Sequence, residues 1–480
     1  MRKVFVKNLA LLQGLNLIIK PVWLLVIDRI AQNSLGAAYG EYFIILNLTL
    51  LLNIVLDLGI QNYNNTKVAG NSTFFKENFT SILLAKFTLS LLYFAIIMLI
   101  GMQREMDAGL LLIIGLNQII TSFILYLRSN ISGLQKYTID SLLSISDKTF
   151  AILFCIGFFY LNQIDIWHFA LAQIAGSMVT LIIASYLNIR YYQQIDASVN
   201  WGQLKLLSVL KKSIPYALLF ALMGFYTRAD VMMMDWLLDK KDAIFHSSIY
   251  AQSFRLLDAA CMFAMLFSGL LLPMFSKLLA EKQDIKPLTE LSVKLLMVIA
   301  IPVALAAQFF GEKMMYALYH FNDIEELILS GHVFGNILFC FVPMCFIYTF
   351  GTLLTAKGDI KAMNIFAVIA LTVNIGLNII LIPRFQSYGA SFSSLITQTI
   401  FAGLCTFRCF YIFKFKFHLK TMGQFVMLIV SLFGVFFLVK GLTNIWITLG
   451  LFGIGTLLLV LALRIFDIKN LLKILVGNKQ

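Results

Sequence analysis

The segment MGFYTRADVMMMDWLL, residues 223–238, places three charged side chains in a stretch that is otherwise apolar enough to cross a membrane. A charge at the centre of a bilayer costs roughly 2.5–3.5 kcal/mol on insertion scales, so such residues face a bundle interior or a water-filled cavity. A guanidinium can hold a phosphate or carboxylate through two parallel hydrogen bonds. Arg228 is therefore a candidate anion-binding residue, and Asp230 and Asp235 are candidates for orienting it or balancing its charge.

Other apolar segments of the chain also contain charged residues, either within them or near their ends. The basic ones are candidate substrate-binding residues: Lys20, Lys86, Lys148 and Arg255, together with Arg228. The acidic ones are candidates for charge balancing or ion coupling: Asp57, Asp147, Asp230, Asp235 and Asp258. The alternative is purely structural pairing. Arg255 and Asp258, for example, lie three residues apart on one helix face, where they can pair.

Lys20 is distinguished by the residue that follows it, Pro21. A proline inside a helix removes one hydrogen-bond donor and frees a backbone carbonyl. Interrupted helices with freed backbone groups are common at transport sites within membranes. We therefore expect Lys20 to lie at a cavity that binds an anion.

The composition is that of an integral membrane protein. Of the 480 residues, 60% are hydrophobic and 13% are charged, whereas a soluble domain is about 45–50% apolar and roughly 25% charged. Mean hydropathy is +0.87. The net charge of +13 does not indicate nucleic-acid binding, because most of the basic residues lie between apolar segments, where the membrane accounts for them.

A membrane-spanning helix needs about 20 mainly apolar residues, and this rule predicts fourteen spans in an all-α fold. An even number places both termini on one side. Roughly 24 Lys and Arg residues lie at the termini and on the connections of that side, against about 7 on the other, so both termini are predicted to be cytoplasmic. The predicted spans are 9–29, 40–60, 79–101, 108–128, 141–161, 166–188, 213–237, 248–274, 289–310, 332–355, 362–382, 389–411, 422–440 and 443–464.

The sequence contains a weak internal repeat. With an offset of 208 residues, Lys20 aligns with Arg228 and Tyr42 aligns with Tyr250. Each half then opens with a helix that carries a cation at membrane depth. The repeat predicts two pseudo-symmetric six-helix bundles in parallel orientation. The expected domains are the first bundle at 1–188, a cytoplasmic linker at 189–212, the second bundle at 213–413, and two extra helices with a cytoplasmic tail at 414–480.

Several classes of site have no motif in the sequence. No GxxxxGK[ST] phosphate-binding loop is present, and the histidines and cysteines have no metal-ligand spacing. The six cysteines all fall in apolar segments: Cys155, Cys261, Cys340, Cys345, Cys405 and Cys409. We expect no cofactor, no metal and no enzymatic activity. Transport would then be passive, or would use an ion gradient or the membrane potential.

Five segments resemble the polysaccharide-biosynthesis branch of the multidrug/oligosaccharidyl-lipid/polysaccharide (MOP) exporter superfamily. They are LDLGIQN (56–62), YLRSNISGLQKYTIDSLLSISDK (126–148), RADVMMM (228–234), IYAQSFRLLDAACMFAMLFSGLLLPMFSK (249–277) and VNIGLNIILIPRFQSYGASFSSLITQ (373–398). The most specific positions are Asn374, Leu377, Asn378, Ile382, Pro383, Gly389 and Ala390. Ser391 stands where a second alanine is common. The resemblance covers at least the first twelve spans.

This resemblance implies a Wzx-type flippase, which moves an oligosaccharide on undecaprenyl diphosphate from the cytoplasmic to the outer leaflet of the bacterial inner membrane. The glycan would belong to an O-antigen, capsule or exopolysaccharide. The expected partners are the lipid-linked substrate, membrane lipids, coupling protons or sodium ions, and other membrane proteins of polysaccharide assembly. A monomer is expected. The resemblance supplies no individual site residues.

Two alternative functions remain open at this point. A cation-coupled drug exporter of the same superfamily would place mainly acidic residues in the core. A membrane glycan polymerase or ligase would need a large outer loop with catalytic charges. The longest predicted outer loop, 311–331, contains acidic residues and a histidine: Glu312, Asp323, Glu325, Glu326 and His320. A solvated loop explains them better than an active site.

Overall fold

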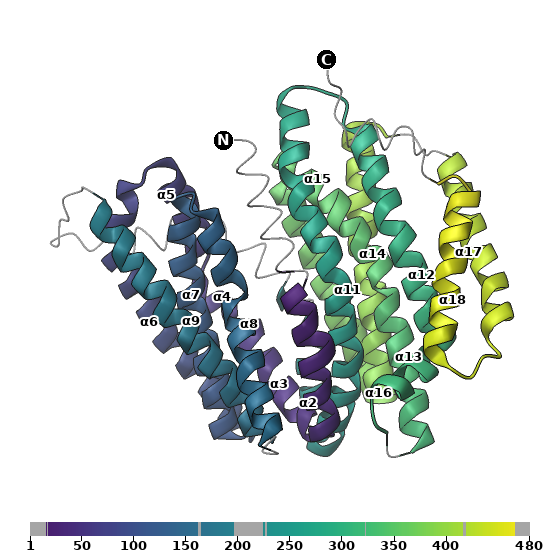
Figure 1. The fold of residues 1–480 in the computed structure, drawn as a ribbon, viewed down its shortest axis with the longest axis horizontal. Coiled ribbons are helices and arrows are strands. Elements are labelled where there is room, and N and C mark those ends of the chain that lie inside the picture. The colour runs from purple at the N-terminus through teal and green to yellow at the C-terminus, as the bar shows by residue number, and fades with distance from the viewer. Residues whose placement is uncertain are drawn as a thin grey trace. The chain divides into compact units, whose positions relative to one another are not determined.

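The computed structural model describes residue 16 and residues 18–161, 165–195, 224–225, 228–321, 323–415 and 419–465. These residues form helices joined by short turns, with no strand among them (Figure 1). Ten helices in the described part are long and apolar enough to cross a membrane. The predicted all-α membrane fold is confirmed.

In the N-terminal half, a helix starts by residue 18 and continues through Pro21 as a short π-helix, η1. Residues after a proline often adopt such a widened turn, because the i→i−4 ladder is interrupted there. The elements are η1 (Trp23–Ile27), α2 (Asp28–Leu35), α3 (Ala38–Leu51), α4 (Asn53–Asp57), α5 (Ile60–Gly70), α6 (Thr73–Gln103), α7 (Ala108–Gly133), α8 (Tyr137–Tyr160) and α9 (Ile166–Gln194).

The C-terminal half begins with helical residues 228–237, which belong to the seventh predicted span. A second π-helix, η2, follows Pro343 within the tenth span. The labelled elements are α11 (Lys240–Ala280), α12 (Lys286–Leu318), α13 (Ile324–Phe339), α14 (Phe341–Phe346), η2 (Ile347–Gly351), α15 (Thr352–Lys357), α16 (Ile360–Phe413), α17 (Leu419–Val439) and α18 (Ile445–Ala462).

The fourteen predicted spans agree with these helices. The 54-residue α16 is kinked at Gln386, whose φ of 46° and ψ of −126° interrupt the helix three residues after Pro383. It therefore contains both the eleventh and the twelfth span. The second span is divided between α3 and α4. The predicted spans 9–29 and 213–237 lie partly outside the described residues, as does most of the predicted linker 189–212.

The chain separates into two compact units. Unit 1 consists of Met1–Ala251 with Asn378–Gln386, and unit 2 consists of Gln252–Leu377 with Ser387–Gln480. In unit 1 a chain of buried amides joins three helices. The Asn64 amide donates to Asn130 at 2.7 Å, and the Asn130 amide donates to Asn188 at 3.0 Å. Such interhelical hydrogen bonds help to hold membrane helices together.

In unit 2, aromatic rings attach the two last helices to α12. Phe309 stacks on Phe436 of α17 with ring centroids 4.4 Å apart. Phe310 meets Phe452 of α18 edge-on at 5.7 Å. Aromatic pairs in these geometries contribute about 0.5–1.5 kcal/mol each beyond the area they bury. The extra helices therefore pack on the second half of the repeat through specific contacts.

The outer loop predicted at 311–331 is much shorter in the structure, because α12 continues to Leu318 and α13 begins at Ile324. The Asp323 carboxylate caps α13 by accepting a hydrogen bond from the Glu326 amide at 2.7 Å. Glu325 and Glu326 lie in the first turn, where the helix dipole favours negative charge. Three of the acidic residues of this segment, Asp323, Glu325 and Glu326, are thus explained by the start of a helix, whereas Glu312 lies within α12.

Candidate functional site

A group of basic residues gathers in unit 1 between the first helix, the end of α7 and the first half of α8. We call Lys20, Arg128 and Lys148 the basic cluster. Lys20 lies within electrostatic range of Arg128, Lys148 and Asp147. Arg128 forms an ion pair with Asp140, with 2.8 Å between Nε and Oδ1. In these interactions the three cations therefore outnumber the two carboxylates, Asp140 and Asp147.

Lys148 is held in place by an aromatic ring. Its ammonium lies 4.8 Å from the centroid of Trp23, in the π-helix that follows Pro21. Trp23 in turn stacks on Phe169 of α9, with centroids 5.7 Å apart. A cation over an indole face is stabilised without being neutralised. The ring contact therefore orients the Lys148 side chain without pairing it with a carboxylate.

The cluster is accessible enough to receive a ligand. Lys20, Asp147 and Lys148 are half-buried rather than enclosed. A partly dehydrated ammonium interacts more strongly with an anion than an ammonium in bulk water does. The arrangement suits a phosphate or diphosphate group better than a cationic compound.

Lys86 and Asp57 form a pair inside unit 1, with 3.0 Å between Nζ and Oδ1. The Lys86 side chain has no exposed surface, whereas that of Asp57 is 28% exposed. Asp57 ends α4, and both Leu58 and Gly59 after it have left-handed backbone conformations. The Asp57 carboxylate also accepts a hydrogen bond from the Gln61 amide at 3.3 Å, which caps α5. This geometry favours a structural role for Lys86 over contact with substrate.

Arg228 and Asp230 have different surroundings in unit 1. A guanidinium nitrogen of Arg228 donates to the Asn47 side-chain oxygen of α3 at 3.3 Å. Asp230 is buried and accepts hydrogen bonds from Tyr250 and from the Asn378 amide, both at 2.7 Å. Asp230 thus binds neighbouring helices, and Asn378 is one of the residues on which the family resemblance is based.

The remaining predicted residues form ion pairs. Asp235 accepts a hydrogen bond from Arg104 Nε at 3.0 Å. In unit 2, Arg255 Nη1 lies 3.8 Å from Asp258 Oδ2, as the three-residue spacing predicts. Arg255 is largely buried, and the Asp258 side chain is 30% exposed.

The sequence patterns did not point to Asp28, Arg128 or Asp140. Asp28 is fully buried and accepts hydrogen bonds from Tyr39 at 2.9 Å and from Gln32 at 2.9 Å. The i, i+4 spacing of Asp28 and Gln32 was a usable local signal. Arg128 and Asp140 lie on different helices, so their sequence positions alone do not link them.

The aligned tyrosines of the repeat have similar roles. Tyr42 and Tyr250 are each only 1% exposed. The Tyr42 hydroxyl bonds to the Gln173 side chain at 2.8 Å, and the Tyr250 hydroxyl donates to Asp230. A buried phenol needs a polar partner, and both positions supply one. The structural match supports the offset of 208 residues.

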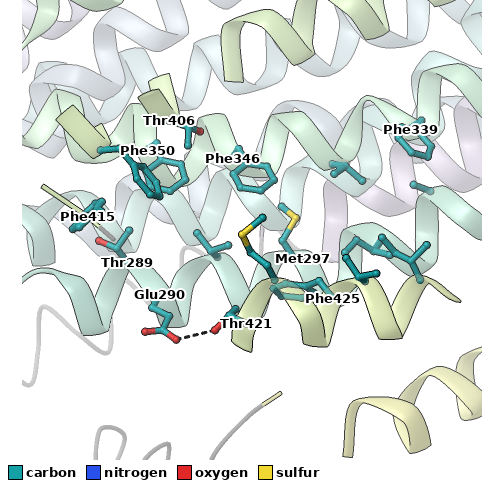
Figure 2. Close-up of a pocket in the computed structure, with 18 of the residues that line it drawn as sticks. Thr289, Glu290, Met297, Phe339, Phe346, Phe350, Thr406, Phe415, Thr421 and Phe425 are labelled. Carbon is teal, nitrogen blue, oxygen red and sulfur yellow. Dashed lines mark hydrogen bonds between the residues drawn. The ribbon is translucent and has the colours of Figure 1, made fainter. Parts of the chain in front are cut away.

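Unit 2 contains an apolar groove with a volume of about 630 Å³. Its walls come from α12, the segment α13–η2, the end of α16, and α17. Figure 2 shows Met297, Phe346, Phe350 and Phe425 along its length. The lining is almost entirely hydrocarbon, aromatic ring and thioether, which suits a flexible apolar chain.

One end of the groove is polar. Lys286, Thr289, Glu290 and Thr421 lie there. The Thr421 hydroxyl donates to Glu290 at 3.3 Å (Figure 2). Glu290 also pairs with Lys294, at 2.8 Å. The groove therefore has an apolar length and one polar end, just as a lipid has an apolar chain and a polar head group.

No group of three or more His, Cys, Asp or Glu side chains in the described residues is arranged to hold a metal ion. The six cysteines are buried and free of disulfides.

Residues 2–279 match the family described as "Polysaccharide biosynthesis protein". A comparison with curated protein sequences finds no match. The fold is similar to that of lipid II flippase MurJ in an inward closed conformation, with a TM-score of 0.70 and 15% identity over 99% of this chain and all of that one.

Two other solved structures share the fold more distantly. A multidrug resistance MATE family transporter of the MOP superfamily, in an inward-facing conformation, gives a TM-score of 0.59 at 11% identity over 84% of this chain and 96% of that one. A MOP superfamily transporter from Pyrococcus furiosus gives 0.59 at 12% identity over 84% and 94%. At these identities the likeness concerns the fold alone.

Proposed function

Because the chain belongs to the polysaccharide biosynthesis protein family and has a flippase and transporter fold, we propose that it is a flippase for lipid-linked oligosaccharides. Its substrate would be an oligosaccharide on undecaprenyl diphosphate, moved from the cytoplasmic to the outer leaflet of the bacterial inner membrane. The observation that carries this proposal is the basic cluster, whose three cations share two carboxylates inside an apolar unit.

The basic cluster would bind the diphosphate. Two ammonium groups and a guanidinium offer several charge-assisted hydrogen bonds to phosphate oxygens. Lys148 is oriented over Trp23, and Lys20 is half-buried beside it. A diphosphate that enters this site exchanges hydration water for fixed cations, which lowers the cost of leaving the aqueous phase.

The apolar groove of unit 2 would bind the hydrocarbon chain of the carrier lipid. Its volume of about 630 Å³ and its apolar lining match part of a long isoprenoid chain. Each methylene that leaves water contributes about 0.8 kcal/mol, but a chain already in lipid gains little from burial. We therefore expect the groove to guide the chain rather than to dominate affinity.

The mechanism would be alternating access of the two predicted six-helix bundles, with both termini in the cytoplasm. The parallel repeat supplies two similar bundles. The roughly threefold excess of Lys and Arg on the predicted inner side supports this orientation.

Translocation of a fluorescent undecaprenyl-diphosphate oligosaccharide tests the function. Liposomes with purified protein are expected to move the labelled lipid between leaflets, as measured by quenching of outer-leaflet fluorescence. Protein-free liposomes and liposomes with an unrelated membrane protein are the controls. If several glycans are not moved, while a cationic drug is exported along a proton or sodium gradient, the drug-exporter alternative replaces this proposal.

The groove is tested by two adjacent residues of α17. Ile429 lines the groove, whereas Val430 is 65% exposed and is not among the lining residues. We expect Ile429→Trp to lower translocation by about tenfold, equivalent to about 1.4 kcal/mol, because the indole fills space needed by the chain. Val430→Trp adds at least as much bulk and is expected to leave translocation unchanged. Equal rates for the two variants would show that the groove is not used by the substrate.

A further inference from the structure

Helix α3 and the turn before it meet the start of α11 in direct backbone contact. A Cβ atom added at Gly40 would lie 1.9 Å from the carbonyl oxygen of Ile244, so no other residue fits there without displacement. One turn away, the Ser248 hydroxyl donates to the Gly36 carbonyl at 3.3 Å. All four residues belong to unit 1. We call this contact the glycine crossing.

The glycine crossing is reciprocal under the internal repeat. With the offset of 208 residues, Gly36 corresponds to Ile244 and Gly40 corresponds to Ser248. Gly36 therefore contacts the equivalent of Gly40, and Gly40 contacts the equivalent of Gly36. Reciprocal pairing of this kind is the property of a contact that lies on a two-fold axis. The crossing thus marks the place where the two repeats face each other.

A second set of contacts in unit 1 joins the turn after α6 to residues 235–240. Arg104, the C-cap residue of α6, donates through Nε to the Asp235 carboxylate at 3.0 Å and through a terminal nitrogen to the Asp235 carbonyl. The Lys240 ammonium donates to the carbonyl of Glu105. Glu105 has a φ of 52°, a left-handed conformation that a non-glycine residue adopts at a cost. We call these contacts the charged latch.

The crossing and the latch lie on the same predicted side of the membrane. The connections after the first, third and seventh spans contain Gly36, Glu105 and Asp239. Odd-numbered connections are on the side opposite to the termini. The contacts also explain why residues 228–251, which open the second repeat, group with the first repeat in unit 1.

We propose that the glycine crossing and the charged latch form the outer gate of the transport path, closed in this structure. Opening to the outer side would separate Arg104 from Asp235 and Lys240 from Glu105. It would also part the backbones at Gly40 and Ile244. Its parts are two small backbone contacts and an ion pair between the partly exposed Arg104 side chain and the largely buried Asp235 side chain, so few contacts have to break when the gate reopens. This proposal rests on the proposed function, because a gate is needed only if the two bundles give alternating access to a transported substrate.

The experiment measures gate opening without measuring transport. Ser248→Cys is labelled from outside intact cells with a membrane-impermeant maleimide, in a background whose six native cysteines are replaced. We expect slow labelling when the latch is intact. Arg104→Ala/Asp235→Ala is expected to raise the labelling rate at least about fivefold, which corresponds to about 1 kcal/mol. The charge reversal Arg104→Asp/Asp235→Arg is expected to restore slow labelling.

Gly40→Ala tests the crossing with a matched control. The added methyl group would collide with the Ile244 carbonyl, so faster labelling of Ser248→Cys is expected. Gly157→Ala is the control, because a Cβ at that position meets no atom within 4 Å. Labelling that is unchanged in both the latch and the crossing variants would overturn the proposal. If labelling responds as expected but no lipid-linked oligosaccharide is moved, the gate stands and the proposed substrate does not.

Discussion

Replacing Lys20 and Lys148 together by glutamine is expected to reduce translocation of an undecaprenyl-diphosphate oligosaccharide by about 100-fold or more. A hydrogen bond to a charged group contributes about 1.5–3 kcal/mol, and each 1.4 kcal/mol corresponds to a factor of about ten. The two lysines supply two of the three cations of the basic cluster. Without them, Arg128 remains engaged with Asp140, so little positive charge is left for a diphosphate.

The measurement is the initial rate of translocation in liposomes at equal amounts of folded protein. Lys20→Arg and Lys148→Arg keep the charge and are expected to retain most of the activity. Lys282→Gln removes a charge from an exposed turn and serves as the neutral control. Arg228→Gln, in the same assay, tests whether the repeat mate of Lys20 also contacts substrate. A fully active Lys20→Gln/Lys148→Gln variant would show that the cluster only pairs with Asp147.

Asp57→Asn is expected to produce the largest loss of stability, about 3–5 kcal/mol in the free energy of unfolding. The reason is that Lys86 has no exposed surface, so the substitution leaves a buried ammonium without its counter-charge. It also weakens the cap at Gln61. The measurement is the midpoint of thermal unfolding in detergent, which is monitored as the loss of monodisperse protein on heating.

The double variant Asp57→Asn/Lys86→Met separates charge from shape. Methionine fills much of the volume of the lysine chain without a charge, so the double variant is expected to be more stable than Asp57→Asn alone. Glu281→Gln, which breaks the exposed pair with Lys277, is expected to change the free energy of unfolding by less than about 1 kcal/mol. An Asp57→Asn protein as stable as the parent would mean that Lys86 finds another partner or loses its proton at little cost.

The fold class and the family follow from the amino-acid sequence alone. Span length and apolar composition are local properties, because a helix in lipid must satisfy its own backbone and needs about 20 apolar residues to cross. All fourteen predicted spans therefore have counterparts among the helices, apart from the parts of 9–29 and 213–237 outside the described residues. The Arg255–Asp258 pair was also predictable from a local property, because residues three positions apart lie on one face of a helix.

Which charged side chains meet depends on how the helices pack against one another. Lys86 and Asp57 are 29 residues apart, and Arg104 and Asp235 are 131 apart. Their pairing depends on how helices rotate and pack, which periodicity does not specify. The groove of unit 2 likewise needs four segments at once. Spacing along one helix shows which face a residue occupies, but the partner on the next helix appears only when both faces are packed together.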